Sequence, residues 1–424
     1  MSASESPPHP LYSASKRHTA SRRTENVLVL QGGGSLGAFG CGVFKALHNN
    51  IHFDIVGGTS IGAVNAAIIC GSRSENPVDD LENFWLEIAE SSYQLIPDAF
   101  FSYYDFIKNV FGIRQIPFGV LNAILFGVPK LFTPRWQIPN FMIGSGAELA
   151  DWMTWPMDWT YYYDHSPLAK TLERYIDYTK LSNRAKKNTG QEKESSTSTR
   201  LIITAVNVLT AKALVFDSAK MEIEPKHILA STAYSAYGFP WIEVNKHTYA
   251  WDGSLLSNTP LKEVIEASPR NDKNVYIVEN YPRQIDRLPN NRSEVIDRTR
   301  DIIFSDKTIY DLRAWSHMSR QTEFIEKLYI VLESSAGKLS LDKTIIDDLR
   351  KEYENLVGNY GAEILSIHRI ARNRMESPHI LKNADFSIKT IKDLIRQGEQ
   401  KTEEHFKGYE DIELSELTRL LYSE

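Results

Sequence analysis

The stretch Gly58-Thr59-Ser60-Ile61-Gly62 decides the fold of this chain. It follows the apolar run 53–57 and opens a helical pattern over residues 63–69. This order of strand, tight turn and helix, with a serine at the turn, is that of a nucleophile elbow. The turn is too tight for a side chain two residues before or after the serine, which explains Gly58 and Gly62. The serine hydroxyl then stands above the sheet edge, where the amide groups of the following helix also point.

A second glycine cluster lies upstream of the elbow. Residues 27–31 read as a buried parallel strand, and the helical pattern of residues 38–47 begins after the cluster. The cluster consists of Gly32, Gly33, Gly34, Ser35, Leu36 and Gly37. Consecutive backbone N–H groups in such a loop can cradle a phosphate, or they can stabilise the oxyanion that forms when a serine attacks an acyl carbonyl.

The same loop also fits a dinucleotide site. Gly32, Gly34 and Gly37 satisfy the pattern G-x-G-x-x-G, and Asp54 stands roughly where an acid that binds ribose is found. An oxidoreductase that uses NAD is therefore one alternative. It leaves the serine elbow without a use, whereas an acyl-transfer site uses both glycine clusters.

A third element is Asp252-Gly253, on a turn between a short apolar segment and a helix that begins near Pro260. Alone, this pair is an ordinary turn signal. Together, the glycine loop, the G-x-S-x-G serine and the downstream D-G aspartate resemble the patatin-like phospholipase family. The segments 163–177, 228–233 and 239–240 agree with this resemblance, which covers roughly residues 25–305.

The resemblance implies a three-layer α/β fold with a mainly parallel central sheet. It also implies a catalytic dyad in which Ser60 is the nucleophile and Asp252 the base. The loop from Gly32 to Gly37 is then the oxyanion hole, in which the Gly32–Gly34 nest and the N–H of Ser35 or Leu36 hold the oxyanion. Two positions depart from the family pattern: Leu36 stands where Arg or Lys is common, and Ser254 where a second glycine often follows Gly253. Leu36 keeps the backbone donors but removes a cation.

An aspartate of ordinary pKa is a poor base for a serine hydroxyl, so the dyad requires a dry pocket that raises the pKa of Asp252. A Ser-His-Asp triad is the alternative, with the histidine after the acid. The candidates are His317, His368, His379 and His405. Each stands in a charged helical stretch, which is typical of a surface histidine.

Composition excludes several other classes of protein. The chain has 424 residues and a formal net charge of −6, so no basic field favours nucleic acid. Its two cysteines, Cys41 and Cys70, fall in predicted helices and indicate buried thiols, and no pattern of metal ligands occurs. We therefore expect no metal and no cofactor.

Four segments stand apart from the predicted catalytic domain 25–305. Residues 1–24 read as a disordered tail without the apolar core of a Sec signal peptide, and 183–200 as a polar loop. The insertion 93–160 is rich in aromatic residues, Trp152 and Phe126 among them, and reads as core or as a lid that meets lipid. Beyond residue 305 we expect a helical C-terminal region, 306–424, with helices over 308–333, 341–357 and 364–375 and a looser tail after Asp385.

The sequence thus predicts hydrolysis of lipid acyl esters, of the phospholipase A or lysophospholipase type. The expected partners are a lipid or phospholipid substrate and a membrane surface, without nucleic acid. The expected location is the cytoplasm or the periphery of a membrane, with leaderless export left open. The alternatives are a general carboxylesterase or thioesterase, a catalytically weak scaffold that binds lipid, and the NAD-dependent oxidoreductase.

Overall fold

The structure is a computed structural model, which describes residues 23–93, 117–135, 159–181, 199–305, 308–339, 342–358, 362–372 and 382–407. Its centre is an eight-stranded sheet of order β10-β9-β1-β2-β5-β8-β7, with β6 also paired to β5. The strands are β1 (Thr24–Leu30), β2 (Ile55–Thr59), β5 (Arg200–Asn207), β6 (Ala213–Asp217), β7 (Ile242–Asn245), β8 (Thr248–Asp252), β9 (Asp272–Glu279) and β10 (Ile364–Ala371).

Five neighbouring strands of this sheet run in the same direction. β10, β9, β1, β2 and β5 pair in parallel, while β6 and β8 pair antiparallel to β5 and β7 antiparallel to β8. The carboxyl ends of parallel strands lie at one edge of a sheet. The two loops that the sequence singles out, after β1 and after β2, therefore start side by side.

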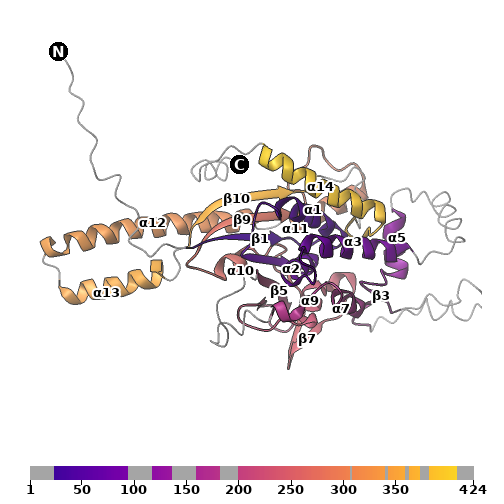
Figure 1. Cartoon of the computed structure of the whole chain (residues 1–424), viewed down its shortest axis with the longest axis horizontal. Coiled ribbons are helices and arrows are strands. Elements are labelled where there is room, and N and C mark those ends of the chain that lie inside the picture. The colour runs from indigo at the N-terminus through magenta and orange to yellow at the C-terminus, as the bar shows by residue number, and fades with distance from the viewer. Residues whose placement is uncertain are drawn as a thin grey trace, which may run out of the picture.

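Helices cover both faces of the sheet, which gives three layers (Figure 1). The larger core packs α1 (Ala38–Leu47), α2 (Ile61–Gly71), α3 (Pro77–Tyr93) and α14 (Ile388–Lys407) on one face, and the smaller core packs α10 (Leu261–Glu266) and the start of α12 (Thr308–Leu339) on the other. The predicted α/β fold with a mainly parallel sheet is confirmed.

Shorter elements surround this core. They are the 3-10 turns η1 (Gly34–Gly37), η3 (Ser235–Tyr237), η4 (Gly253–Leu255) and η6 (Lys382–Ala384), the helices α5 (Phe118–Phe126), α7 (Ser166–Leu172), α9 (Pro225–Thr232), α11 (Arg292–Phe304) and α13 (Lys343–Tyr353), the π-helical turn η5 (Glu354–Gly358), and the two-residue strands β3 (Thr133–Pro134) and β4 (Tyr163–Asp164). α12 and α13 extend together from one end of the molecule (Figure 1).

The C-terminal region is helical only in part, and two expectations about it are wrong. Residues 364–371 form β10, not a helix, and α14 occupies the stretch predicted as a loose tail. Ile364, Ile367 and Ile370 are buried at a spacing of three, which resembles a helical pattern. In β10 the spacing has another cause: a bulge between Ile364 and Ser366 shifts the register, so Ile364 and Ile367 reach one core and Ile370 the other.

Several predicted segments lie wholly or mostly outside the described residues. They are the tail 1–24, the polar loop 183–200, residues 94–116 and 136–158 of the insertion with Trp152, and His379. Among the helices that the structure does describe, none is both long and apolar enough to cross a membrane.

Candidate active site

Ser60 stands at the turn between β2 and α2 in a backbone conformation that is rare for a residue with a side chain, at φ 56° and ψ −127°. The turn is closed by contacts that leave no room for a Cβ at either glycine. One on Gly58 would collide with the backbone of Gly62, and one on Gly62 with the carbonyl of Leu30. The strained backbone and the two glycines give the elbow geometry that the sequence predicts.

The glycine loop runs from β1 to α1 beside this turn. Two of its N–H groups are already used, because Gly32 donates to Asn258 O at 3.1 Å and Leu36 donates to Gly33 O at 3.1 Å. Gly33 (φ 152°) and Gly34 (φ 57°) have backbones that favour glycine, and both line the cavity described below. Leu36 is therefore a poor candidate for the oxyanion donor, and Gly33 and Gly34 are better ones.

The remaining loop residues face the protein interior. The Ser35 hydroxyl donates to Lys382 O at 3.3 Å, and the Leu36 side chain is fully buried. A Cβ on Gly37 would lie 2.7 Å from Ile61 Cγ2. Ser35, Leu36 and Gly37 thus anchor the loop and do not line the cavity.

Asp252 ends β8, and its side chain is fully buried. Oδ1 accepts a hydrogen bond from Ser254 N at 2.8 Å, whereas Oδ2 accepts none from the described residues. Burial raises the pKa of the Asp252 carboxyl to about 6, against the opposing effects of the Ser60 hydroxyl and Ser254. A carboxylate with a raised pKa and an unused oxygen next to Ser60 has the properties of a general base.

Gly253 allows Asp252 to sit this deep. Its φ is not positive, so the turn does not require the conformational freedom that the sequence suggests. Instead, a Cβ there would lie 2.7 Å from Thr204 O and 2.9 Å from Thr59 Cγ2. The glycine is needed because β5 and β2 approach it closely.

The end of α9 joins the two candidate catalytic residues. Ser60 N donates to Ser231 Oγ at 3.0 Å, and Asp252 N donates to Ala233 O at 3.0 Å. The segment 228–233, one of those that agree with the family resemblance, therefore holds the backbones of both the serine and the aspartate.

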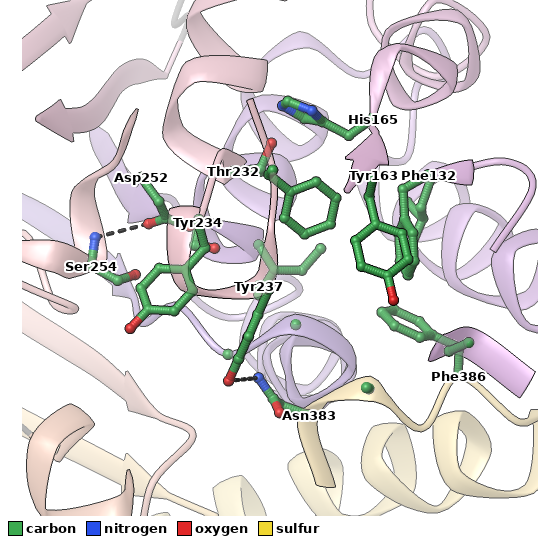
Figure 2. Close-up of a pocket in the computed structure, with 18 of the residues that line it drawn as sticks. Phe132, Tyr163, His165, Thr232, Tyr234, Tyr237, Asp252, Ser254, Asn383 and Phe386 are labelled. Carbon is green, nitrogen blue, oxygen red and sulfur yellow. Dashed lines mark hydrogen bonds between the residues drawn. The ribbon is translucent and has the colours of Figure 1, made fainter. Parts of the chain in front are cut away.

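Ser60 and Asp252 line a cavity of about 320 Å³. Figure 2 shows Asp252 among the residues that surround it. Ser254 and Asn258 form a polar end of the cavity beside Ser60, since a Cβ built on Gly32 would lie 2.9 Å from Ser254 Oγ, 2.4 Å from Asn258 Oδ1 and 3.0 Å from Ser60 Cβ. His165, Thr232 and Asn383 also line the cavity. The other side chains of the wall are apolar or aromatic, and belong to Ile61, Ala123, Ile124, Leu131, Phe132, Tyr163, Leu168, Tyr234, Tyr237, Phe239, Tyr281, Phe304, Ala384 and Phe386. A largely apolar cavity of this kind suits a hydrocarbon chain whose reactive end reaches Ser60.

A model of the family described as patatin-like phospholipase matches residues 28–265. The chain belongs to this family. Membership of this family supports a general activity as a lipid acyl hydrolase. The roles of individual residues are argued from the geometry of the site. No curated protein sequence matches the chain.

Two solved structures resemble this patatin-like chain at low similarity. VipD from Legionella pneumophila is 14% identical with a TM-score of 0.37, over 94% of this chain and 72% of VipD. The ExoU–SpcU complex from the type III secretion system of Pseudomonas aeruginosa matches at 16% identity and a TM-score of 0.29, over 79% of this chain and 67% of that chain.

Three of the four histidines of the triad alternative, His317, His368 and His405, fall within the described residues and lie away from the cavity. His317 is exposed on α12, and His368 Nδ1 lies 3.3 Å from His405 Nε2 between β10 and α14. None of these three lines the cavity. The histidine that does so is His165, whose Nε2 contacts Leu229 O at 3.0 Å and whose pKa burial lowers.

The dinucleotide alternative fails on the position of its acid. Asp54 comes just before β2, where its Oδ2 accepts a hydrogen bond from Asn26 N at 3.0 Å. This is the amino end of the strand, whereas the glycine loop follows the carboxyl end of parallel β1. Asp54 therefore lies at the opposite edge of the sheet from the loop. Within the described residues, no cluster of three metal-ligating side chains is present either.

Sequence reasoning missed the contribution of the C-terminal region to the site. Asn383, Ala384 and Phe386 line the cavity, and the backbone of Asn383 packs against Gly34. Lys382 fixes this segment, since its buried Nζ lies 3.0 Å from Asp297 Oδ1 and 2.5 Å from Asp301 Oδ1 on α11. No local motif marks these residues, because their role comes only from packing against the glycine loop.

Proposed function

We propose that this protein hydrolyses acyl ester bonds of phospholipids, as a phospholipase A or lysophospholipase. The observation that supports the proposal most strongly is the meeting of a strained serine and a fully buried carboxylate of raised pKa at the polar end of one apolar cavity. A long acyl chain fits the aromatic wall, and its ester carbonyl then lies beside Ser60.

In the proposed reaction, Ser60 Oγ attacks the ester carbonyl while Asp252 Oδ2 accepts the hydroxyl proton. Gly33 and Gly34 line the same cavity and would supply their N–H groups, and the first amides of α2, next to Ser60, lack partners within the helix. These groups would hold the oxyanion of the tetrahedral intermediate. Its collapse passes the Asp252 proton to the departing alcohol and leaves an acyl-serine.

A water molecule then completes the cycle. Asp252, ionised again, takes a proton from the water as it attacks the acyl-serine carbonyl, and the same donors hold the second oxyanion. Collapse returns the proton to Ser60 Oγ and releases a free fatty acid. No histidine takes part in either half of the reaction.

A serine-directed fluorophosphonate probe and a lipid assay test this proposal together. Ser60→Ala should lose both labelling and release of fatty acid from phospholipid by several orders of magnitude. Thr232→Val is the matched control, since it removes a hydroxyl at the cavity that donates to the carbonyls of Ile228 and Leu229 in its own helix. Labelling that survives in Ser60→Ala would disprove the proposal, and unlabelled wild-type protein that binds lipid would favour the scaffold alternative.

A further inference from the structure

The cavity lacks a fixed positive charge of its own. Of the described residues that line it, none is a lysine or an arginine, and the side chain of Leu36 in the glycine loop is buried and uncharged. A phospholipid carries a phosphodiester only a few bonds from its ester carbonyls. A cation for that phosphate must therefore come from a second layer around the cavity.

Arg300 on α11 occupies this second layer. It precedes the cavity residue Phe304 by one helical turn, so the two share a helix face. Its Nη1 donates to Asn383 Oδ1 at 3.2 Å, and its Cζ lies 5.9 Å from the centre of the Tyr237 ring. Asn383 Nδ2 in turn donates to the Tyr237 hydroxyl at 3.0 Å, and both residues line the cavity (Figure 2).

The charge of Arg300 reaches the cavity wall electrostatically. Burial raises the pKa of Tyr234 and of Tyr281, and in both cases Arg300 opposes the rise. Asn383 also packs its backbone against Gly34 of the glycine loop. Arg300 is thus connected through one residue to the loop that we propose as oxyanion hole.

Arg300 forms no ion pair with a carboxylate among the residues that the structure describes, and its hydrogen bond goes to the amide oxygen of Asn383. Asp297 and Asp301, on the same helix, are both engaged by Lys382. Arg298 donates to the carbonyls of Pro282 and Arg283. A guanidinium has five N–H donors, and Asn383 accepts from one of them, which leaves donors for an oxyanion.

We propose that Arg300, with the side chains of Asn383 and Tyr237, forms a phosphate subsite beside the catalytic cavity that takes the phosphodiester of a phospholipid substrate. This inference rests on the proposed function and narrows its substrate class. The guanidinium binds two phosphate oxygens, and Asn383 and Tyr237 hold its plane toward the cavity. The subsite supplies the cation that Leu36 does not.

The test compares two short-chain lipids with the same acyl groups, dihexanoyl phosphatidylcholine and dihexanoylglycerol, both used as monomers. Arg300→Gln should lower kcat/KM for the phosphatidylcholine by about tenfold or more, because it removes a charge-assisted contact, and should leave the neutral lipid within about twofold. Arg300→Lys keeps the charge but lacks the planar set of guanidinium donors, so its kcat/KM for the phosphatidylcholine should lie between those of the wild type and Arg300→Gln. Arg292→Gln, an exposed change on the same helix, is the matched control and should affect neither lipid.

Inorganic phosphate distinguishes a lipid headgroup from a free anion. One result would overturn the headgroup assignment in favour of a site for a free anion. In that result, phosphate inhibits hydrolysis of both lipids equally in the wild type but not in Arg300→Gln, and Arg300→Gln loses no more activity on phosphatidylcholine than on dihexanoylglycerol. An equal loss on both lipids would also overturn it. Fluorophosphonate labelling of Ser60 in Arg300→Gln separates these results from failure of the proposed function: a labelled variant without lipid selectivity refutes the subsite alone.

Discussion

Replacing Asp252 by asparagine should abolish turnover and yet stabilise the folded protein near neutral pH. The carboxyl is fully buried, and its pKa rises from 3.8 to about 6 on folding. The folded state therefore binds this proton more tightly than the unfolded chain does. The resulting contribution to stability is present below pH 4 and is lost as the pH rises through about 6.

The size of the effect follows from the shift. About two pKa units, at 1.36 kcal/mol each, correspond to roughly 3 kcal/mol that the ionised carboxylate costs the folded protein at pH 8. Asparagine carries no charge at any pH and keeps the oxygen that accepts from Ser254 N. Its amide group replaces Oδ2, which accepts no hydrogen bond from the described residues, so few contacts are lost.

Urea denaturation at pH 8 and pH 4.5 measures this difference. We expect Asp252→Asn to gain up to about 3 kcal/mol in free energy of unfolding at pH 8 and much less at pH 4.5. Asp393→Asn, at an exposed ion pair with Arg396, is the control and should change stability by under about 1 kcal/mol at either pH. A variant less stable than the wild type at pH 8, or a gain equal at both pH values, would refute the argument from burial.

Three further predictions address the remaining parts of the site. The kcat/KM for a neutral ester should increase with pH and follow an apparent pKa near 6, so that its value at pH 5 is roughly a tenth of the plateau value. A kcat/KM that stays constant down to about pH 4.5 would exclude Asp252 as the base. Lys382→Met should lower the free energy of unfolding by about 3–5 kcal/mol in thermal or urea unfolding, because Asp297 and Asp301 lose their buried partner. A loss under about 1 kcal/mol would show that these two ion pairs do not stabilise the fold. Phe132→Ala should slow hydrolysis of a long-chain ester far more than that of a short soluble ester, whereas equal losses that track the melting temperature would make Phe132 a core residue only.

The sequence by itself determined the parts of this protein that depend on short-range geometry. A turn as tight as that at Ser60 excludes a Cβ at Gly58 and Gly62, so these two glycines in the sequence predict the turn directly. The order of β1, glycine loop, β2 and elbow likewise follows from apolar runs and glycines that are local in the chain. These features identify the fold and the candidate nucleophile without any knowledge of distant contacts.

Only the tertiary structure decided what the C-terminal region contributes. The bulge in β10 gives its isoleucines a spacing that resembles a helix, and the strand is recognisable only when it is paired with β9. Asn383 stands far from the catalytic motifs in sequence and lines the cavity because the ion pairs of Lys382 with Asp297 and Asp301 hold this segment against α11. Arg300, equally distant in sequence, lies behind the cavity wall in contact with Asn383. The raised pKa of Asp252 has the same origin, since burial depends on every segment packed around a residue and no single stretch of sequence records it.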